Sequence, residues 1–137
     1  MNDLELESEL QELYLVSKHW ISDMEFLEDE IRFLKSLVSR YWRFILQSDD
    51  LIEVQELNIM LMLFEENIPG IKSRIREYLR FIEQLVINKD KAQGLNVRES
   101  FNPLRLEIIR MSGSIRSLKS SYFILTEKLL PGGNKAD

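Results

Sequence analysis

Apolar residues recur at alternating intervals of three and four residues along almost all of this 137-residue chain, in three separate runs. An average interval of 3.5 residues keeps one apolar stripe on a single face of an α-helix, as in the helices of coiled coils. The pattern therefore predicts an all-α fold in which three long helices pack through their stripes. The first run is Leu6, Leu10, Leu13, Ser17, Trp20, Met24, Leu27, Ile31, Leu34, Val38, Tyr41 and Ile45, in which only the serine is polar. The second run is Val54, Leu57, Leu61, Phe64, Ile68, Ile71, Ile75, Tyr78, Ile82 and Leu85. The third run is Val97, Phe101, Leu104, Ile108, Met111, Ile115, Leu118, Tyr122, Leu125 and Leu129.

Turn and capping residues set the expected helix boundaries. A single domain over residues 1–130 is expected to hold helices at about 4–46, 50–93 and 98–130, followed by a flexible tail at 131–137. Residues 47–50 read Gln-Ser-Asp-Asp, a turn in which Ser48 or Asp49 can cap the second helix.

Pro69 and Gly70 interrupt the second run, and two interpretations compete. A proline inside a helix costs about 3 kcal/mol, so the helix could break there. However, Phe64, Ile68 and Ile71 keep the helical spacing across the proline, which a loop has no reason to preserve. The phase favours one continuous helix that is kinked near Pro69 and ends before Gly94.

The start of the third helix has two alternatives. Asn96 with Glu99 three residues later forms a capping-box pattern. Asn102 followed by Pro103 forms a cap with proline at its favoured first helical position. Either predicts a helix that ends near residue 130.

Charge is distributed in blocks along the chain. Residues 1–30 carry ten acidic side chains and one basic one, whereas the rest of the first helix is basic. The second helix reverses this order, with acidic residues first and basic residues from Lys72 onward. An antiparallel hairpin sets acid against base at both ends, so the blocks favour an elongated, antiparallel, up-down-up three-helix bundle.

Composition gives no sign of catalysis or membrane insertion. The chain has no cysteine, and the longest nearly apolar run, Leu57 to Phe64, is far shorter than the roughly 20 residues of a membrane span. The acidic start does not resemble a secretory signal, so we expect a cytoplasmic location. His19, the one histidine, is expected on the surface without a catalytic partner. We expect no catalytic residues, no metal site and no cofactor.

The sequence has more apolar residues than three packed stripes require. They occur on the outer sides of the predicted helices, where contiguous apolar side chains mark partner surfaces. These candidate partner-surface residues are Phe26, Phe33, Ile59, Met62, Leu63, Leu106, Ile109, Phe123 and Ile124.

The segment from Trp20 to Ile31 contains a tryptophan, an acid–aromatic pair at Glu25-Phe26, and Asp29-Glu30 before an apolar residue. In this it resembles small uncharacterised bacterial helical-bundle proteins, over the first helix only. That resemblance implies no activity and no site residues. The pattern of three helices is also similar to that of spectrin repeats, which is an analogy of architecture.

The function that these patterns favour is a non-catalytic protein–protein interaction or scaffolding module. Its expected partner is itself, as a homodimer, or a helix of another protein. The alternative is peripheral binding to an anionic membrane or to nucleic acid. That alternative depends on residues 67–137, which carry 13 basic and 7 acidic side chains.

Overall fold

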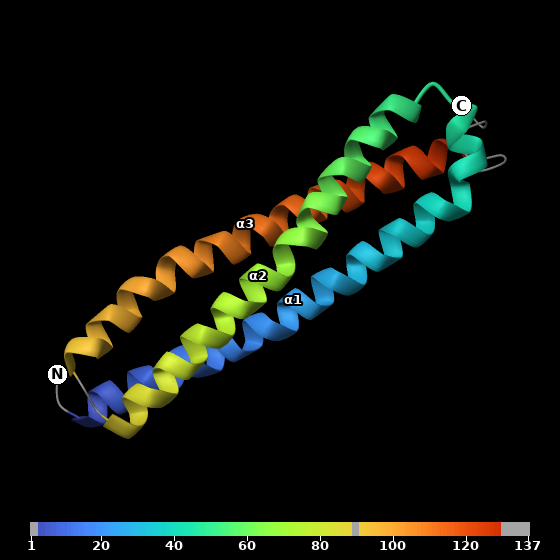
Figure 1. The fold of residues 1–137 in the computed structure, drawn as a ribbon. Coiled ribbons are helices and arrows are strands. Elements are labelled where there is room, and N and C mark those ends of the chain that lie inside the picture. The colour runs from blue at the N-terminus through green and yellow to red at the C-terminus, as the bar shows by residue number, and fades with distance from the viewer. Residues whose placement is uncertain (1–2, 89–90, 130–137) are drawn as a thin grey trace. The chain divides into compact units, whose positions relative to one another are not determined.

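Three helices make up the part of the chain that the computed structural model describes, residues 3–88 and 91–129, with side chains at 4–88 and 96–129. They are α1 (Asp3–Leu46), α2 (Leu51–Asn88) and α3 (Lys91–Leu129), coloured from blue to red in Figure 1. No strand occurs in these described ranges. The prediction of an all-α chain with three long helices is confirmed.

The apolar runs form the core. Every position of the three runs is buried or half-buried, and Met24, Ile68 and Ile75 have no exposed surface. Because burial of apolar surface is the main favourable term in folding, these stripes are what hold the helices together. Among the described residues, no helix combines the length and hydrophobicity that crossing a bilayer requires.

The turn between α1 and α2 is stabilised by Ser48. Its hydroxyl donates to the carbonyl of Ile45 at 2.8 Å and accepts the amide N–H of Asp50 at 3.2 Å. The carbonyl of Asp50 accepts the N–H of Val54 at 2.9 Å, which is the first intrahelical bond of α2. Asp50 is therefore at the N-cap of α2, and Ser48 stabilises the turn before it.

The boundary between α2 and α3 lies earlier than the turn residues predict. α2 ends at Asn88 instead of near residue 93, and α3 begins at Lys91, before both predicted starts. Gly94, Asn96 and Asn102-Pro103 all lie within α3. Tertiary contacts outweigh these local signals, because the first turns of α3 carry Val97 and Phe101 into the core. The predicted tail at 131–137 lies outside the described residues.

α2 is continuous through Pro69. Ile68 and Ile71 on either side of the proline are buried, whereas Pro69 itself is exposed. The helical phase is therefore kept across the proline, as the spacing of the second run indicates.

The helices form two compact units, each built from parts of all three helices. Unit 1 comprises the described residues of Met1–Phe26 and Ile68–Arg110. In its core the rings of Trp20 and Phe101 stack at 4.9 Å between centroids, and the Tyr78 hydroxyl donates to the Val97 carbonyl at 2.8 Å. These contacts join the α1, α2 and α3 segments of unit 1.

Unit 2 comprises the described residues of Leu27–Asn67 and Met111–Asp137. Ile45, Val54 and Leu125 form a buried cluster with one residue from each helix. The Tyr122 hydroxyl donates to Oδ1 of Asn58 at 2.6 Å, which joins α3 to α2. That the two units behave as a single domain stays a prediction.

Candidate interaction surfaces

All nine apolar residues that the sequence assigns to a partner surface are exposed. Their exposed fractions run from 38% for Phe123 to 61% for Phe26. Phe26, Leu106 and Ile109 belong to unit 1, and the other six to unit 2. Their exposure agrees with the placement that the pattern predicts, and their role in binding stays a prediction.

The largest group lies on the outer side of α2 in unit 2. Ile52, Ile59 and Leu63 are 71%, 56% and 50% exposed. With Glu56 and Glu66 they follow the helical spacing 4-3-4-3, so the five side chains share one stripe, which we call the α2 outer face. The buried residues of the same segment lie on the opposite side of the helix. The α2 outer face is thus an apolar centre with a carboxylate on either side.

The α2 outer face has one sign of charge. Residues 51–67 contain four glutamates and no lysine or arginine. Glu65 accepts from Nζ of Lys35 at 3.0 Å, outside the face. Glu56 and Glu66 make no ion pair within the described ranges, so both charges are available to a partner.

The outer side of α3 in unit 2 carries both signs of charge. The side chains that are exposed on this side of the helix, which we call the α3 outer face, are Arg116, Ser117, Ser120, Ile124, Glu127 and Lys128. Ile124, the apolar residue of this face, is 56% exposed. Within the described chain, Arg116 and Lys128 make no ion pair.

Two of the predicted surface residues meet each other. The rings of Phe33 and Phe123 lie edge to face with centroids 6.1 Å apart. Lys119 places its ammonium 5.6 Å from the centroid of Phe123 and pairs with Glu30 at 2.7 Å. These two rings therefore stabilise unit 2 itself, through the α1–α3 contact.

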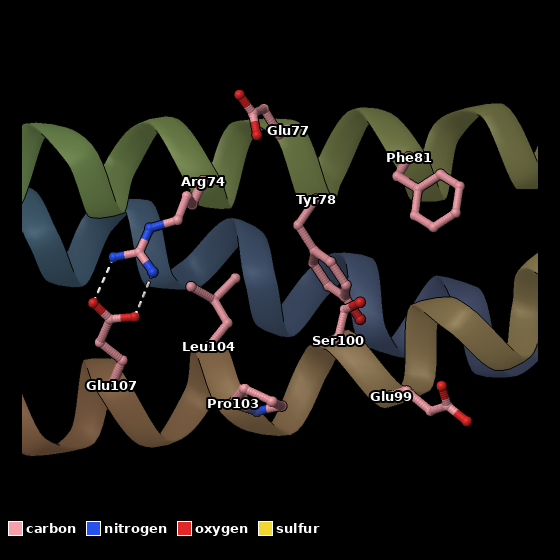
Figure 2. Close-up of a pocket in the computed structure, with 9 residues that line it drawn as sticks. All are labelled: Arg74, Glu77, Tyr78, Phe81, Glu99, Ser100, Pro103, Leu104 and Glu107. Atoms are coloured by element: carbon pink, nitrogen blue, oxygen red, sulfur yellow. Dashed lines mark hydrogen bonds and ion pairs between the residues drawn. The ribbon is translucent and has the colours of Figure 1, made fainter.

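Unit 1 has a groove at Pro103. Its volume is about 660 Å³. Figure 2 shows the Arg74–Glu107 pair near one end, the Phe81 ring toward the other, and Glu77 and Glu99 directed away from it. Because proline lacks an N–H, the Glu99 carbonyl loses its helical donor, and Glu99 is exposed, where water can replace it. The lining residues are Arg74, Glu77, Tyr78, Phe81, Glu99, Ser100, Pro103, Leu104 and Glu107.

Arg74, Glu107 and Tyr78 of this groove are already engaged within unit 1. Arg74 donates two hydrogen bonds to Glu107, at 2.6 and 2.5 Å, and these bonds lower the pKa of the Glu107 carboxyl and raise that of Arg74. Burial raises the pKa of Tyr78, whose hydroxyl donates to Val97. These groups thus stabilise the α2–α3 contact of unit 1.

His19 lies on the surface, as expected. Its side chain is 76% exposed, and Nε2 lies 3.6 Å from Oδ1 of Asp23, one helical turn away. The described residues contain no group of three or more histidine and acidic side chains arranged to hold a metal ion.

Ion pairs join the acidic part of α1 to α3. Glu9 pairs with Arg98 in unit 1, and Glu30 pairs with Lys119 in unit 2. Lys35 of α1 pairs with Glu65 of α2 in unit 2. Several basic side chains of the second half of the chain are thus partnered inside the protein.

Sequence reasoning missed two exposed apolar residues of α2 in unit 2. Ile52 and Met60 are 71% and 45% exposed. Ile52 lies one heptad before Ile59, so extending the outer stripe by seven residues would have found it. The Pro103 groove could not be predicted, because its lining residues come from two helices whose contacts the spacing does not specify.

Comparison with protein-family models, with curated proteins and with solved structures gives no match to this chain.

Proposed function

We propose that this chain is a non-catalytic protein–protein interaction or scaffolding module that associates with itself, as a homodimer. The α2 outer face is the observation that carries the proposal. Ile59 and Leu63 are half or more exposed on successive turns, and Ile52 is 71% exposed about two turns before Ile59, although the core already has a complete apolar run in the same helix. A contiguous exposed apolar stripe bordered by charge is typical of a partner surface.

The helix directions of this proposed module are up, down, up, with coiled-coil-like packing. In unit 1, two contacts support a parallel arrangement of α1 and α3. Glu9 of α1 pairs with Arg98 of α3, and Trp20, later in α1, stacks on Phe101, later in α3. The α1–α2 partners of unit 2 support antiparallel helices. There Lys35 pairs with Glu65, whereas Ile45, later in α1, packs with Val54, earlier in α2.

We include a kink at Pro69 in this proposal. Pro69 lies inside α2 and has no N–H to donate to the Glu65 carbonyl, and its ring crowds that carbonyl. A cytoplasmic location remains part of the proposal, and cell fractionation would test it.

The alternative, binding of anionic membranes or nucleic acid, has no specific structural support. The basic residues Arg74, Arg98 and Lys119 make ion pairs with Glu107, Glu9 and Glu30. Side chains engaged in this way contribute less to a field that attracts polyanions.

Sedimentation velocity over a range of protein concentrations tests self-association. The wild type is expected to shift from monomer to dimer as concentration rises. The variant I59S/L63S should dimerise at least about tenfold more weakly, since burial of each apolar side chain contributes about 1.5–3 kcal/mol.

The matched control is L15S/V16S, which removes two exposed apolar side chains from α1 in unit 1. It should associate like the wild type. A wild type that stays monomeric at the highest concentration would overturn the proposal. If I59S/L63S and L15S/V16S weaken dimerisation equally, the α2 outer face is not the dimer interface.

A further inference from the structure

Two exposed apolar surfaces of this chain carry opposite charges, and we infer that the α2 outer face of one copy docks on a basic surface of α3 in a second copy. That basic surface, which we call the Leu106 face, lies on the outer side of α3 in unit 1. Its side chains are all exposed, and they are Asn102, Arg105, Leu106, Ile109 and Arg110. The inference rests on the proposed self-association and names its two surfaces.

The Leu106 face has an apolar centre with a basic side chain at either end. Leu106 and Ile109 are 43% and 50% exposed and lie about one helical turn apart. Arg105 directly precedes this apolar pair, and Arg110 directly follows it. Neither arginine makes an ion pair within the described residues. Both charges are therefore available to a partner.

Two glutamates of α3 lie near this face, and neither reverses its charge. Glu107 is half-buried and accepts two hydrogen bonds from Arg74, so its charge is balanced within unit 1. Glu99 is exposed and precedes Arg105 by six residues, which places it about 9 Å away along the helix and about 120° around it. A carboxylate of a partner that meets Arg105 therefore lies at the other edge of the face from Glu99.

The surroundings of the other predicted partner-surface residues single out the Leu106 face. Phe33 and Phe123 contact each other within unit 2. Phe26 belongs to residues 1–30, which carry ten acidic side chains and one basic one. The α3 outer face of unit 2, which holds Ile124, is mixed in charge. Among the predicted residues outside α2, the apolar pair of the Leu106 face is the one that unpaired basic side chains border on both sides.

Charge favours this pairing over contacts between identical faces. Two α2 outer faces would set Glu56 and Glu66 against the same glutamates, since residues 51–67 contain no basic side chain. Two Leu106 faces would set arginine against arginine. Like charges in contact disfavour both arrangements, whereas the mixed pairing sets acid against base.

The positions of the charges are compatible with one helix–helix contact. Glu56 and Glu66 are ten residues apart, about 15 Å along a helix. Arg105 and Arg110 are five residues apart, about 7.5 Å. With the two faces centred on each other, the offset is about 4 Å at each end, which is less than the length of an arginine side chain. Both carboxylates can therefore reach a guanidinium.

The apolar centres of the two faces come together in this pairing. Ile59 and Leu63 lie between the glutamates of the α2 outer face. The apolar pair of the Leu106 face lies between its arginines in the same way. Burial of these four exposed side chains supplies the attraction, and the charges select the partner.

Both faces point away from the cores of their own units. Leu61 of α2 is buried in unit 2, and Leu104 and Ile108 of α3 are buried in unit 1. Each face lies on the side of its helix opposite to these residues. Each is therefore open to a second copy.

Charge reversal with mixing tests the inference. The variants are E56K/E66K, which makes the α2 outer face basic, and R105E/R110E, which makes the Leu106 face acidic. Each variant alone is expected to self-associate at least roughly tenfold more weakly than the wild type in sedimentation velocity, because like charges then face each other. An equimolar mixture is expected to recover association, since each variant then finds an opposite charge on the other.

Two further measurements separate this pairing from a contact between two α2 outer faces. L106S/I109S is expected to weaken association as I59S/L63S does, because both apolar centres are buried in the contact. Higher ionic strength is expected to weaken association of the wild type, since salt screens the attraction between the faces. A contact between two α2 outer faces would be indifferent to L106S/I109S and would be strengthened by salt.

Exposed charges away from both faces supply the controls. E12K/E25K on α1 and R76E/R80E on α2 make the same changes of net charge within unit 1. Both should associate like the wild type, and circular dichroism should show full helicity for all the variants.

The outcomes separate this inference from the proposed function. Association of the wild type that R105E/R110E does not weaken, or no recovery in the mixture, would overturn the pairing of these faces and leave self-association standing. Absence of association by the wild type would overturn both.

Discussion

Ser17 is the one polar residue in the first apolar run, and the structure buries it completely. Its side chain has no exposed surface, and its hydroxyl has no hydrogen-bond partner among the described residues. A buried hydroxyl without a partner has lost its bonds to water and gained nothing in return. Such a group destabilises the fold that contains it.

Replacing Ser17 by alanine is therefore expected to stabilise the protein. S17A removes the unsatisfied hydroxyl with little change of volume, and alanine is the better helix former. We expect the free energy of unfolding to rise by about 1 kcal/mol, measured by urea denaturation followed by circular dichroism.

The matched control is a buried hydroxyl that does have a partner. Thr126 is 8% exposed, and its hydroxyl donates to the Tyr122 carbonyl at 2.9 Å. T126V keeps the side-chain shape and loses that bond, so it should not stabilise. A loss of stability in S17A comparable to that in T126V would show that the Ser17 hydroxyl is satisfied after all.

At the scale of the helices, two glycines occupy positions where a larger residue fits. Gly70 of α2 and Gly113 of α3 are helical and exposed, and a Cβ at either position would meet no atom within 4 Å. Glycine inside a helix is about 1 kcal/mol less favourable than alanine, because its backbone loses more freedom on folding.

G70A and G113A are each expected to raise the free energy of unfolding by about 0.5–1 kcal/mol in the same denaturation assay. G113A serves as the reference, since no proline adjoins it. If G70A destabilises while G113A stabilises, the backbone beside Pro69 needs glycine, which would locate the proposed kink at this pair.

The helices, the core and the turn between α1 and α2 could be predicted from the sequence, whereas the boundary between α2 and α3 could not. The 3.5-residue repeat identified the buried apolar positions, because burial follows the periodicity of the helix itself. Gly94 and Asn102-Pro103 predicted the wrong boundary between α2 and α3, because they reflect only local helix-end preferences. The hydroxyl of Tyr78 bonds the carbonyl of Val97, and Trp20 stacks on Phe101, so contacts from two other helices hold the early turns of α3.

The candidate surfaces were readable in part. Phase alone identifies Ile59 and Leu63 as outward, and both are exposed. Phase does not say which outward residues meet across helices, so the Phe33–Phe123 contact could not be predicted. Helical phase also does not reveal which charged side chains form ion pairs. Glu65 pairs with Lys35, whereas Glu56 has no ion pair among the described residues.

For the whole molecule, the proposed self-association predicts that stability depends on protein concentration. A partner that binds only the folded state adds about 2.7 kcal/mol of stability when its concentration is about 100 times Kd. The thermal midpoint of the wild type is therefore expected to rise with protein concentration in differential scanning calorimetry. The midpoint of I59S/L63S should rise less over the same range, because this variant is expected to dimerise more weakly.

This measurement is independent of sedimentation, because it reports on the folded state through unfolding. A wild-type midpoint that does not change with concentration would argue that the exposed apolar face of α2 binds something other than this chain.

Neither compact unit is a continuous stretch of polypeptide. Unit 1 needs Ile68–Arg110 to join the earlier Met1–Phe26, and unit 2 needs residues after Arg110 to join Leu27–Asn67. A ribosome releases the chain from its amino terminus, so unit 1 can be completed during synthesis before unit 2. Until residues 111–129 emerge, residues 27–67 lack the α3 side chains that complete their core. The order of synthesis thus completes unit 2, which carries the α2 outer face, after unit 1.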